Sequence, residues 1–262
     1  MKDMKNKSLI FNALYFMGSI AILLGIWQII TWTTKSEIPG PFKTLVVFAD
    51  MLKNPFYDNG PNDKGIGVQL MSSIGRVFLG FLFGSLVAIP LGILMGSSKI
   101  GMRLINPIVQ ILRPVSPLAW FPLGLLAFKS APSATVFVIF ITSLWPTLIN
   151  TAFGVSSIPQ DFINVAKAYG FSKYKYITKI LLPYALSHII TGLRLSIGVA
   201  WMVIVAGEML SGGLGIGFFV WDSWNGGNLE KILCAILIIG IVGLLLDRAF
   251  SSLQNRLSYD KK

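Results

Sequence analysis

Long apolar runs separated by short polar segments dominate the chain. Each run is about 20 residues long, the length of helix that crosses about 30 Å of hydrocarbon. We predict six membrane spans, at residues 9–32, 70–95, 104–128, 134–153, 184–207 and 232–250. Because helices satisfy their own backbone hydrogen bonds in lipid, the pattern predicts an all-α membrane protein with a single transmembrane domain over residues 1–262.

The third apolar run is the least regular, because the sequence RPVSP interrupts it at residues 113–117. Pro114 and Pro117 remove backbone donors that lipid cannot replace, so we expect this bend to face protein or water. An alternative for this run is an amphipathic helix followed by one short span.

Small residues recur at every fourth position in two of the predicted spans. They are Gly80, Gly84, Ala88, Gly92 and Gly96 in the second run, and Gly192, Ser196 and Ala200 in the fifth. Small side chains let two membrane helices approach closely. We predict that both stripes pack helices within one subunit, with contact between two subunits as the alternative.

A polar segment at residues 164–183 separates the fourth and fifth runs. Its lysines alternate with aromatic residues, and these side chains are Lys167, Lys173, Lys175, Lys179, Tyr169, Phe171, Tyr174 and Tyr176. We predict a short helix over about residues 163–176 that binds another protein through aromatic anchors with a charged rim. The alternative is a basic helix on the surface of anionic lipid.

Composition agrees with a membrane protein and explains the charge. The chain is 54% hydrophobic and 13% charged, with a mean hydropathy of +0.70 and a net charge of +11. With both termini in the cytoplasm, thirteen Lys and Arg residues lie on the cytoplasmic side and six on the other, as the positive-inside rule requires. These cations lie at the ends of apolar runs and form no continuous basic face, so we expect no nucleic-acid partner.

The chain lacks the parts of a catalytic or metal site. It contains one histidine, His188, and one cysteine, Cys234, and no carboxylates paired at helical spacing. The glycines at residues 213–217 lack the GK[ST] ending of a phosphate-binding loop and predict a tight turn. We therefore expect no metal, no cofactor and no catalysis by this chain, which argues against a membrane-embedded enzyme.

Three arginines fall inside the second, third and fifth apolar runs, namely Arg76, Arg113 and Arg194, whereas acidic residues such as Glu208 and Asp247 lie near run ends. An embedded charge is costly and faces the protein interior or a water-filled cavity. We therefore predict a path for an anion, with Glu208 and the ring of Trp201 also beside it. The alternative is that each arginine binds backbone carbonyls or extends to the lipid headgroups.

The segment at residues 164–183 also carries a recognisable spacing of residues. Asn164-Val165-Ala166-x3-Gly170 followed by Ile180-x-Leu182-Pro183 resembles the EAA loop of binding-protein-dependent ABC importer permeases. Asn164 and Val165 depart from the Glu and first Ala of that loop. The stretches IPGPFKTLVVFADML, RPVSPLAWFPLGLLAF and RLSIGVAWMVIVAGEML are similar to the nitrate, bicarbonate, taurine and sulfonate permeases, and GLGIGFFVWDSWN is most similar to the nitrate type.

This resemblance implies a type I ABC importer permease fold in the inner membrane. It implies two permease copies, most simply a homodimer, on two ATPase subunits that bind ATP and Mg²⁺, with a periplasmic or lipid-anchored binding protein. The residues that it places at the ATPase are Asn164, Val165, Ala166, Lys167, Tyr169, Gly170, Phe171, Lys173, Tyr174 and Pro183. It favours nitrate or nitrite as substrate, with bicarbonate, cyanate and taurine or alkanesulfonates as alternatives. An ATP-independent anion channel or carrier is the alternative of a different class.

Overall fold

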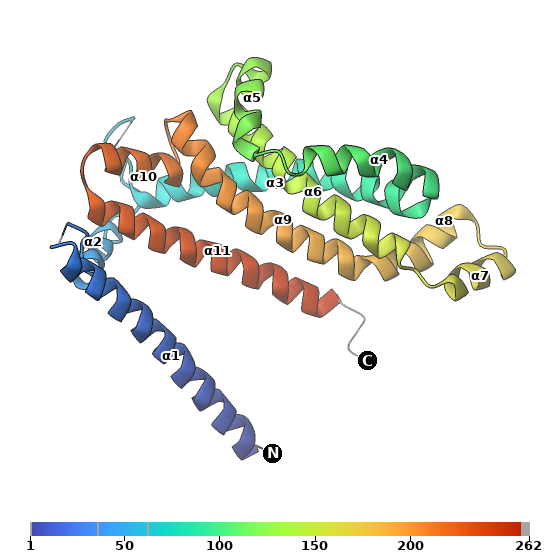
Figure 1. Cartoon of the computed structure of the whole chain (residues 1–262), viewed down its shortest axis with the longest axis horizontal. Coiled ribbons are helices and arrows are strands. Elements are labelled where there is room, and N and C mark those ends of the chain that lie inside the picture. The colour runs from blue at the N-terminus through green and yellow to red at the C-terminus, as the bar shows by residue number, and fades with distance from the viewer. Residues whose placement is uncertain (1, 36, 62, 258–262) are drawn as a thin grey trace.

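The computed structural model describes residues 2–35, 37–61 and 63–257 (Figure 1). Lys261 and Lys262, which the charge count includes, lie outside the described residues. The helices are α1 Lys2–Thr33, α2 Pro41–Met51, α3 Ile66–Ser97, α4 Lys99–Leu112, η1 Pro117–Trp120, α5 Phe121–Phe128, α6 Ala131–Ser156, α7 Gln160–Ala168, α8 Lys173–Tyr176, η2 Ile177–Leu181, α9 Leu182–Ser211, α10 Ile216–Asn225 and α11 Leu229–Leu257. Of these, η1 is a 3₁₀ turn and η2 is π-helical.

Within the described residues, five helices are long and apolar enough to cross a membrane, and a bent pair could supply a sixth span. The predicted all-α membrane fold is thereby confirmed. Helices α3, α6, α9 and α11 run along the long axis of the molecule (Figure 1). Helices α7 and α8 lie at one end, called the α7 end below, and α2 and α10 lie at the other, called the α10 end.

Helix α6 forms the centre of the bundle, between α3 and α9. A Cβ atom added to Gly80 would lie 2.6 Å from Ile139 Cγ2, and one added to Gly92 would lie 2.6 Å from Thr151 Cβ. Helix α9 approaches α6 as closely, because a Cβ at Gly192 would lie 2.9 Å from the Cα of Thr147. Both small-residue stripes therefore pack helices within this chain, as predicted, because only a missing side chain permits this approach.

Helix α6 continues through Pro146, which cannot donate a backbone hydrogen bond. The Ser196 hydroxyl of α9 lies beside this position, where it donates to the Ser143 carbonyl (2.5 Å) and accepts from the Thr147 N–H (3.1 Å). Lipid offers no such partners, so a hydroxyl from a neighbouring helix binds the backbone groups of Ser143 and Thr147 next to the proline. This contact also sets the register between α6 and α9.

The third apolar run, predicted as one span at residues 104–128, is divided in the structure. Helix α4 ends at Leu112, and α5 follows after η1, with the two parts bent by 96°. Pro114 and Pro117 account for the break, since neither can donate to a preceding turn. The arrangement corresponds to the alternative of an amphipathic helix followed by a short apolar one.

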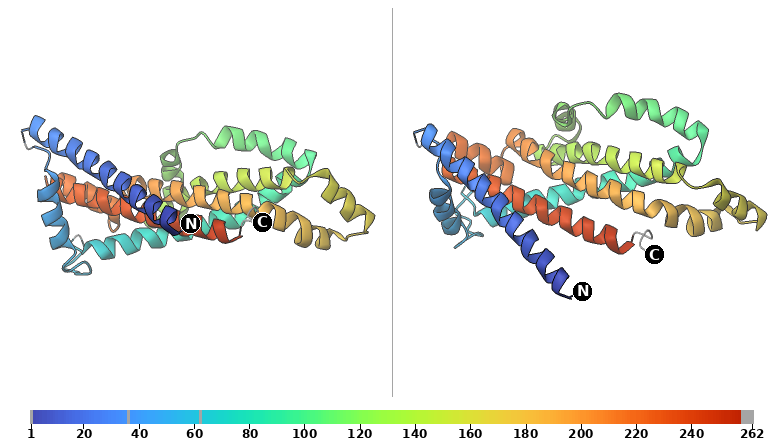
Figure 2. Two further views of the ribbon diagram at one scale, coloured as in Figure 1. Left: turned by 90° about the horizontal axis from the view of Figure 1, so that it is seen from below. Right: turned by 60° about the horizontal axis from the view of Figure 1, so that its bottom comes forward.

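Helix α11 packs along α9, where the Trp201 indole N–H donates to the Ile239 carbonyl (2.9 Å). Helix α1 instead stands apart from the bundle (Figure 2), and only 6% of its membrane span, Leu14–Thr33, is buried. Such a largely apolar surface requires lipid or another protein to cover it. The single chain therefore presents more apolar surface than its own core can bury.

Candidate functional site

The sequence predicts one helix over residues 163–176, but the structure has α7 there and then the start of a continuous helical stretch, Lys173–Ser211, whose first turn is α8. Helix α7 ends in a Schellman motif, because the Gly170 N–H donates to the Lys167 carbonyl and the Phe171 N–H to the Ala166 carbonyl (3.0 and 2.9 Å). Gly170 has the left-handed φ of 61° that this motif needs. Helix α8 then begins at Lys173, with the Ser172 hydroxyl accepting from the Lys175 N–H (3.3 Å).

The polar segment is fastened to the ends of α6 and α9. The ring of Phe162 in α7 lies 6.3 Å from that of Tyr184 in α9, and the Tyr184 hydroxyl donates to the Ser157 carbonyl (3.1 Å). Ala166 is buried, and Tyr176 packs against the core cluster that contains Leu181. The two helices at the α7 end are therefore held to the ends of two central helices by side-chain contacts.

The exposed face of the polar segment carries two unburied tyrosines among lysines. Tyr169 and Tyr174 are 77% and 78% exposed. Phe171 is half-buried, and the Lys175 ammonium lies 4.2 Å from its ring centre. Of the four predicted aromatic anchors, Tyr169 and Tyr174 are free to contact a partner, whereas Phe171 is partly covered and Tyr176 belongs to the core.

The remaining predicted contact residues are mostly exposed. Asn164, Val165, Lys167, Lys173 and Pro183 lie on the surface, in contrast to the buried Ala166. Asn164, at the position of the family Glu, accepts a hydrogen bond from Gln160 Nε2 (3.2 Å). Because the Asn164 side chain is neutral and is bound within its own helix, it makes no ion pair with any described residue.

Arg76, in α3, forms an ion pair with Glu208, in α9. Arg76 Nη1 lies 2.7 Å from Glu208 Oε1, and the Glu208 side chain is completely buried. The carboxylate also accepts from the Ser73 hydroxyl (2.8 Å) and the Gly217 N–H (3.0 Å). Arg76 Nη1 additionally donates to the Leu214 carbonyl (2.5 Å). Glu208 therefore holds together α3, α9 and the turn before α10.

The same cluster explains the glycines of the 213–217 turn. The Gly215 N–H donates to Gln69 Oε1 (2.6 Å), and a Cβ atom there would lie 2.2 Å from the Glu208 carboxyl carbon. A Cβ at Gly217 would lie 2.1 Å from the Val205 carbonyl oxygen. The turn predicted from these glycines is thus present. Sequence analysis missed Gln69 and Ser73 because they lie more than 130 positions from their partners.

Arg194, in α9, is also paired with an acid. Its Nε and Nη2 atoms lie 2.7 and 2.8 Å from the two carboxylate oxygens of Asp247, in α11, and Nη1 lies 3.5 Å from Gln254 Oε1. The premise that the embedded arginines lack embedded anions is therefore wrong for Arg76 and Arg194. Acids near run ends in sequence reach them from neighbouring helices, because adjacent helices run in opposite directions.

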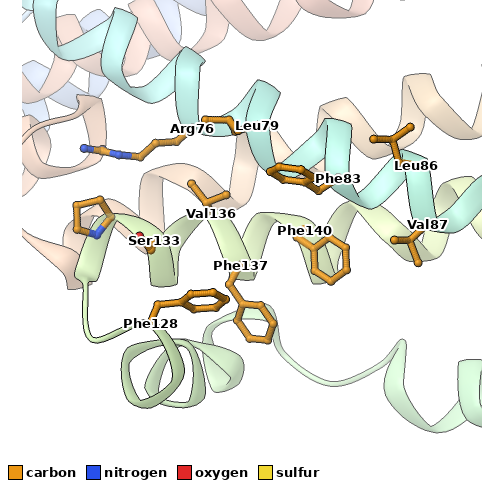
Figure 3. Close-up of a pocket in the computed structure, with 11 residues that line it drawn as sticks. Arg76, Leu79, Phe83, Leu86, Val87, Phe128, Ser133, Val136, Phe137 and Phe140 are labelled. Atoms are coloured by element: carbon orange, nitrogen blue, oxygen red, sulfur yellow. The ribbon is translucent and has the colours of Figure 1, made fainter.

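Neither Trp201 nor Arg76 lies on an open polar path in this chain. Trp201 is 3% exposed and packs in the core between α9 and α11. Arg76 is at one end of an apolar groove of about 760 Å³ between α3 and α6, and its guanidinium points away from Phe83 and Leu86 (Figure 3). The groove wall is almost wholly hydrocarbon and aromatic, which suits lipid or a packed helix better than an anion.

Arg113 differs from the other two arginines. It lies at the break between α4 and η1, is exposed, and borders a separate cavity that Trp120, Thr142 and Trp145 also line. None of the described residues accepts a hydrogen bond from it or forms an ion pair with it. In the described part of the chain, no group of three or more His, Cys, Asp or Glu residues is placed to hold a metal ion.

Comparison with known proteins finds one family and several relatives along most of the chain. The family described as "Binding-protein-dependent transport system inner membrane component" matches residues 88–259. The nitrate import permease protein NrtB of Synechocystis sp. is 46% identical over 237 residues, covering 90% of this chain and 86% of its own. The bicarbonate transport system permease protein CmpB of Synechococcus elongatus is 44% identical, covering 91% and 87%.

The fold is shared with a solved transporter. A chain of the MetNI methionine ABC transporter in an inward-facing conformation superimposes with a TM-score of 0.64 at 17% identity, covering 72% of this chain and 94% of its own. At this identity the likeness concerns the fold. It shows the type I importer architecture that the sequence predicts.

Proposed function

Because the chain belongs to the family of binding-protein-dependent transport system inner membrane components, we propose that it is the permease subunit of an ATP-driven importer of nitrate or nitrite. The observation that supports nitrate as the substrate is 46% identity to a nitrate import permease along 90% of the chain. Bicarbonate is the second candidate, since a bicarbonate permease is 44% identical over a similar length. The permease itself hydrolyses nothing.

The polar segment is the surface that receives the ATPase. Its exposed Tyr169 and Tyr174 are suited to enter a groove on the partner, and its lysines favour an acidic rim around that groove. Since Phe162 and Tyr184 fasten the segment to α6 and α9, closure of an ATPase dimer moves these helices as rigid bodies. The direct coupling favours this role over a helix that lies on lipid.

The remaining partners follow from the same arrangement. A second copy of the chain, in a homodimer, would cover part of the apolar surface that one chain leaves exposed, and inner-membrane lipid would cover the rest. The α7 end faces the cytoplasm together with both termini. The α10 end faces the periplasm, where a soluble or lipid-anchored binding protein delivers the anion to the loops around α2 and α10.

The test is uptake of labelled nitrate into proteoliposomes that contain the permease, its ATPase and its binding protein, with unlabelled bicarbonate, cyanate and taurine as competitors. Uptake that needs ATP and that none of these competitors lowers is the expected result. Uptake competed by bicarbonate instead would keep the importer and change the substrate. Flux without ATP or partners would replace the importer with a channel or carrier.

The role of the polar segment is tested by Tyr174→Ala. Truncating a tyrosine at the centre of an interface costs at least about 2 kcal/mol, or about 30-fold in affinity. We expect the ATPase to be lost from the purified complex and uptake to fall with it. Tyr15→Ala is the control, because Tyr15 is similarly exposed at 73% but lies in α1. Equal ATPase binding by both variants would contradict the assignment.

A further inference from the structure

Of Arg76, Arg113 and Arg194, Arg113 is the one that the described part of the chain leaves without a partner. Arg76 is neutralised by Glu208 and Arg194 by Asp247, in both cases through an acid on a neighbouring helix. No described residue plays that part for Arg113. A cation without a counter-ion within a membrane domain is costly, so such residues occur where an anion or water reaches them.

Three independent helices place Arg113 near the middle of the bundle. It follows α4, whose 14 residues extend about 21 Å from the α7 end. Thr142 and Trp145, which border the same cavity, lie about 17–21 Å along α6, whose 26 residues span about 39 Å. Val199 lies about 26 Å along the 45 Å or so of α9. At this depth the Arg113 guanidinium cannot reach lipid headgroups at the α7 end unless the backbone conformation between α4 and η1 changes.

The cavity beside Arg113 is shaped for a small anion. Its volume is about 250 Å³, and a water takes about 30 Å³ in the liquid, so a small oxyanion fits with several waters. Guanidinium and indole groups are hydrogen-bond donors without acceptors, and none of the described residues accepts from the indoles of Trp120 or Trp145. No acidic side chain is among the described residues that line it.

The break between α4 and η1 supplies the opening. Pro114 and Pro117 interrupt the helix where Arg113 leaves it, and backbone interrupted at membrane depth is tolerated where it lines a water-filled cavity. Broken helices near the midplane are a recurring way to build an ion or substrate site in transporters. Here the break, the unpartnered Arg113 and a cavity that Arg113, Trp120 and Trp145 line coincide.

We propose that the cavity at the α4–η1 break is an oxyanion-binding site on the translocation path, with Arg113 as the residue that binds the anion. This inference rests on the proposed function only for the identity of the cargo. The positive charge draws the anion to mid-depth, and the indole N–H groups of Trp120 and Trp145 complete its coordination. The exposed side of the cavity faces the second copy of the chain or the water between the two copies.

The test measures the charge selectivity of the cavity and does not depend on transport. A single thiol is introduced by Val199→Cys in a Cys234→Ala background, in the reconstituted complex of permease, ATPase and binding protein. The thiol is modified by two methanethiosulfonate reagents of similar size, one an anionic sulfonate and the other a cationic trimethylammonium. We expect the anionic reagent to be favoured, and Arg113→Gln to lower the ratio of the two rates by about tenfold, as expected for one unit charge at short range.

Two further variants separate charge from folding. Arg113→Lys keeps the charge and should keep most of the ratio, whereas Arg103→Gln removes an exposed charge of α4 away from the cavity and should not change it. Nitrate should slow the anionic reagent in the wild type and not in Arg113→Gln. An unchanged ratio in Arg113→Gln would overturn the proposal, as would an introduced thiol that neither reagent reaches with or without ATP.

The outcome is distinguishable from failure of the proposed function. If the wild-type complex takes up no nitrate with ATP, the importer assignment fails while the labelling ratio remains readable. If the wild-type complex takes up nitrate, the Arg113→Gln complex is compared with it for the maximal rate of uptake and for the concentration of binding protein that gives half of that rate. If both are unchanged, the anion does not pass Arg113, and the oxyanion site alone is refuted.

Discussion

Replacing Glu208 should destabilise the permease more than any other single change of charge in its membrane helices. The carboxylate is completely buried and accepts hydrogen bonds from Ser73, Arg76 and the Gly217 N–H. Removing one partner of a buried ion pair costs about 3–5 kcal/mol, because the other charge remains buried. The Arg76 side chain retains 15% exposure and its bond to Leu214, which places Glu208→Ala near the lower limit, at about 3 kcal/mol.

The measurement is thermal denaturation of the purified protein in detergent, followed by loss of the monodisperse peak on size exclusion. With about 2–4 °C for each kcal/mol in a chain of this size, Glu208→Ala should lower the midpoint by about 6–12 °C. Glu208→Gln should lower it by less, since an amide oxygen can still accept from Ser73 or Gly217. Unfolding of this kind is irreversible, so all variants are compared at one heating rate.

Two comparisons make the prediction specific to the buried pair. Asp247→Asn removes the partner of Arg194, but the Asp247 side chain is 51% exposed. The thermal midpoint of this variant should therefore fall less than that of Glu208→Ala. Combining Arg76→Gln with Glu208→Gln should cost less than the sum of the single changes, by about 1–3 kcal/mol. A midpoint for Glu208→Ala within about 1 °C of the wild type, or strict additivity in the cycle, would refute the reasoning.

Three further predictions follow from the packing of the helices and from the loop before α3. Gly92→Ala places a Cβ 2.6 Å from Thr151 and should lower the thermal midpoint, whereas Gly75→Ala on the same helix meets open space and should not. Ser196→Ala leaves buried backbone groups of α6 beside Pro146 without their partner and should lower the free energy of unfolding by about 1–3 kcal/mol. Ser156→Ala, at an exposed position, should lower it little, and equal losses in the two variants would contradict the prediction. Hydrogen bonds from Lys64 and then from the Gly60 N–H lower the pKa of Asp58, so the loop is stabilised above the unfolded pKa and loses this contribution as pH falls through the folded one. The protection of the loop amides, as the ratio of the intrinsic to the observed exchange rate at each pH, should therefore fall in acid, and Asp58→Asn should abolish that dependence.

Periodicity along the chain predicted the apolar helices and the faces on which they pack. Glycines spaced four apart share one face of a helix, so their role against α6 could be inferred before any partner was known. The polar segment was found the same way, because lysines and tyrosines between two apolar runs have no place in a bilayer. The end of α7 at Gly170 could not be predicted in the same way, since the Schellman motif depends on backbone hydrogen bonds across the turn.

The sequence by itself determined the class of protein, the apolar runs and the polar segment between α6 and α9, because these depend on composition and on local spacings. Only the tertiary structure decided which embedded arginine is free. Arg76 meets Glu208 across 132 positions and Arg194 meets Asp247 across 53. Such pairs depend on how each helix is rotated and shifted against its neighbours, which no local pattern encodes. Among the described residues Arg113 has no partner for the same reason, since it lies at a 96° break between two helices and away from the acids of α9 and α11.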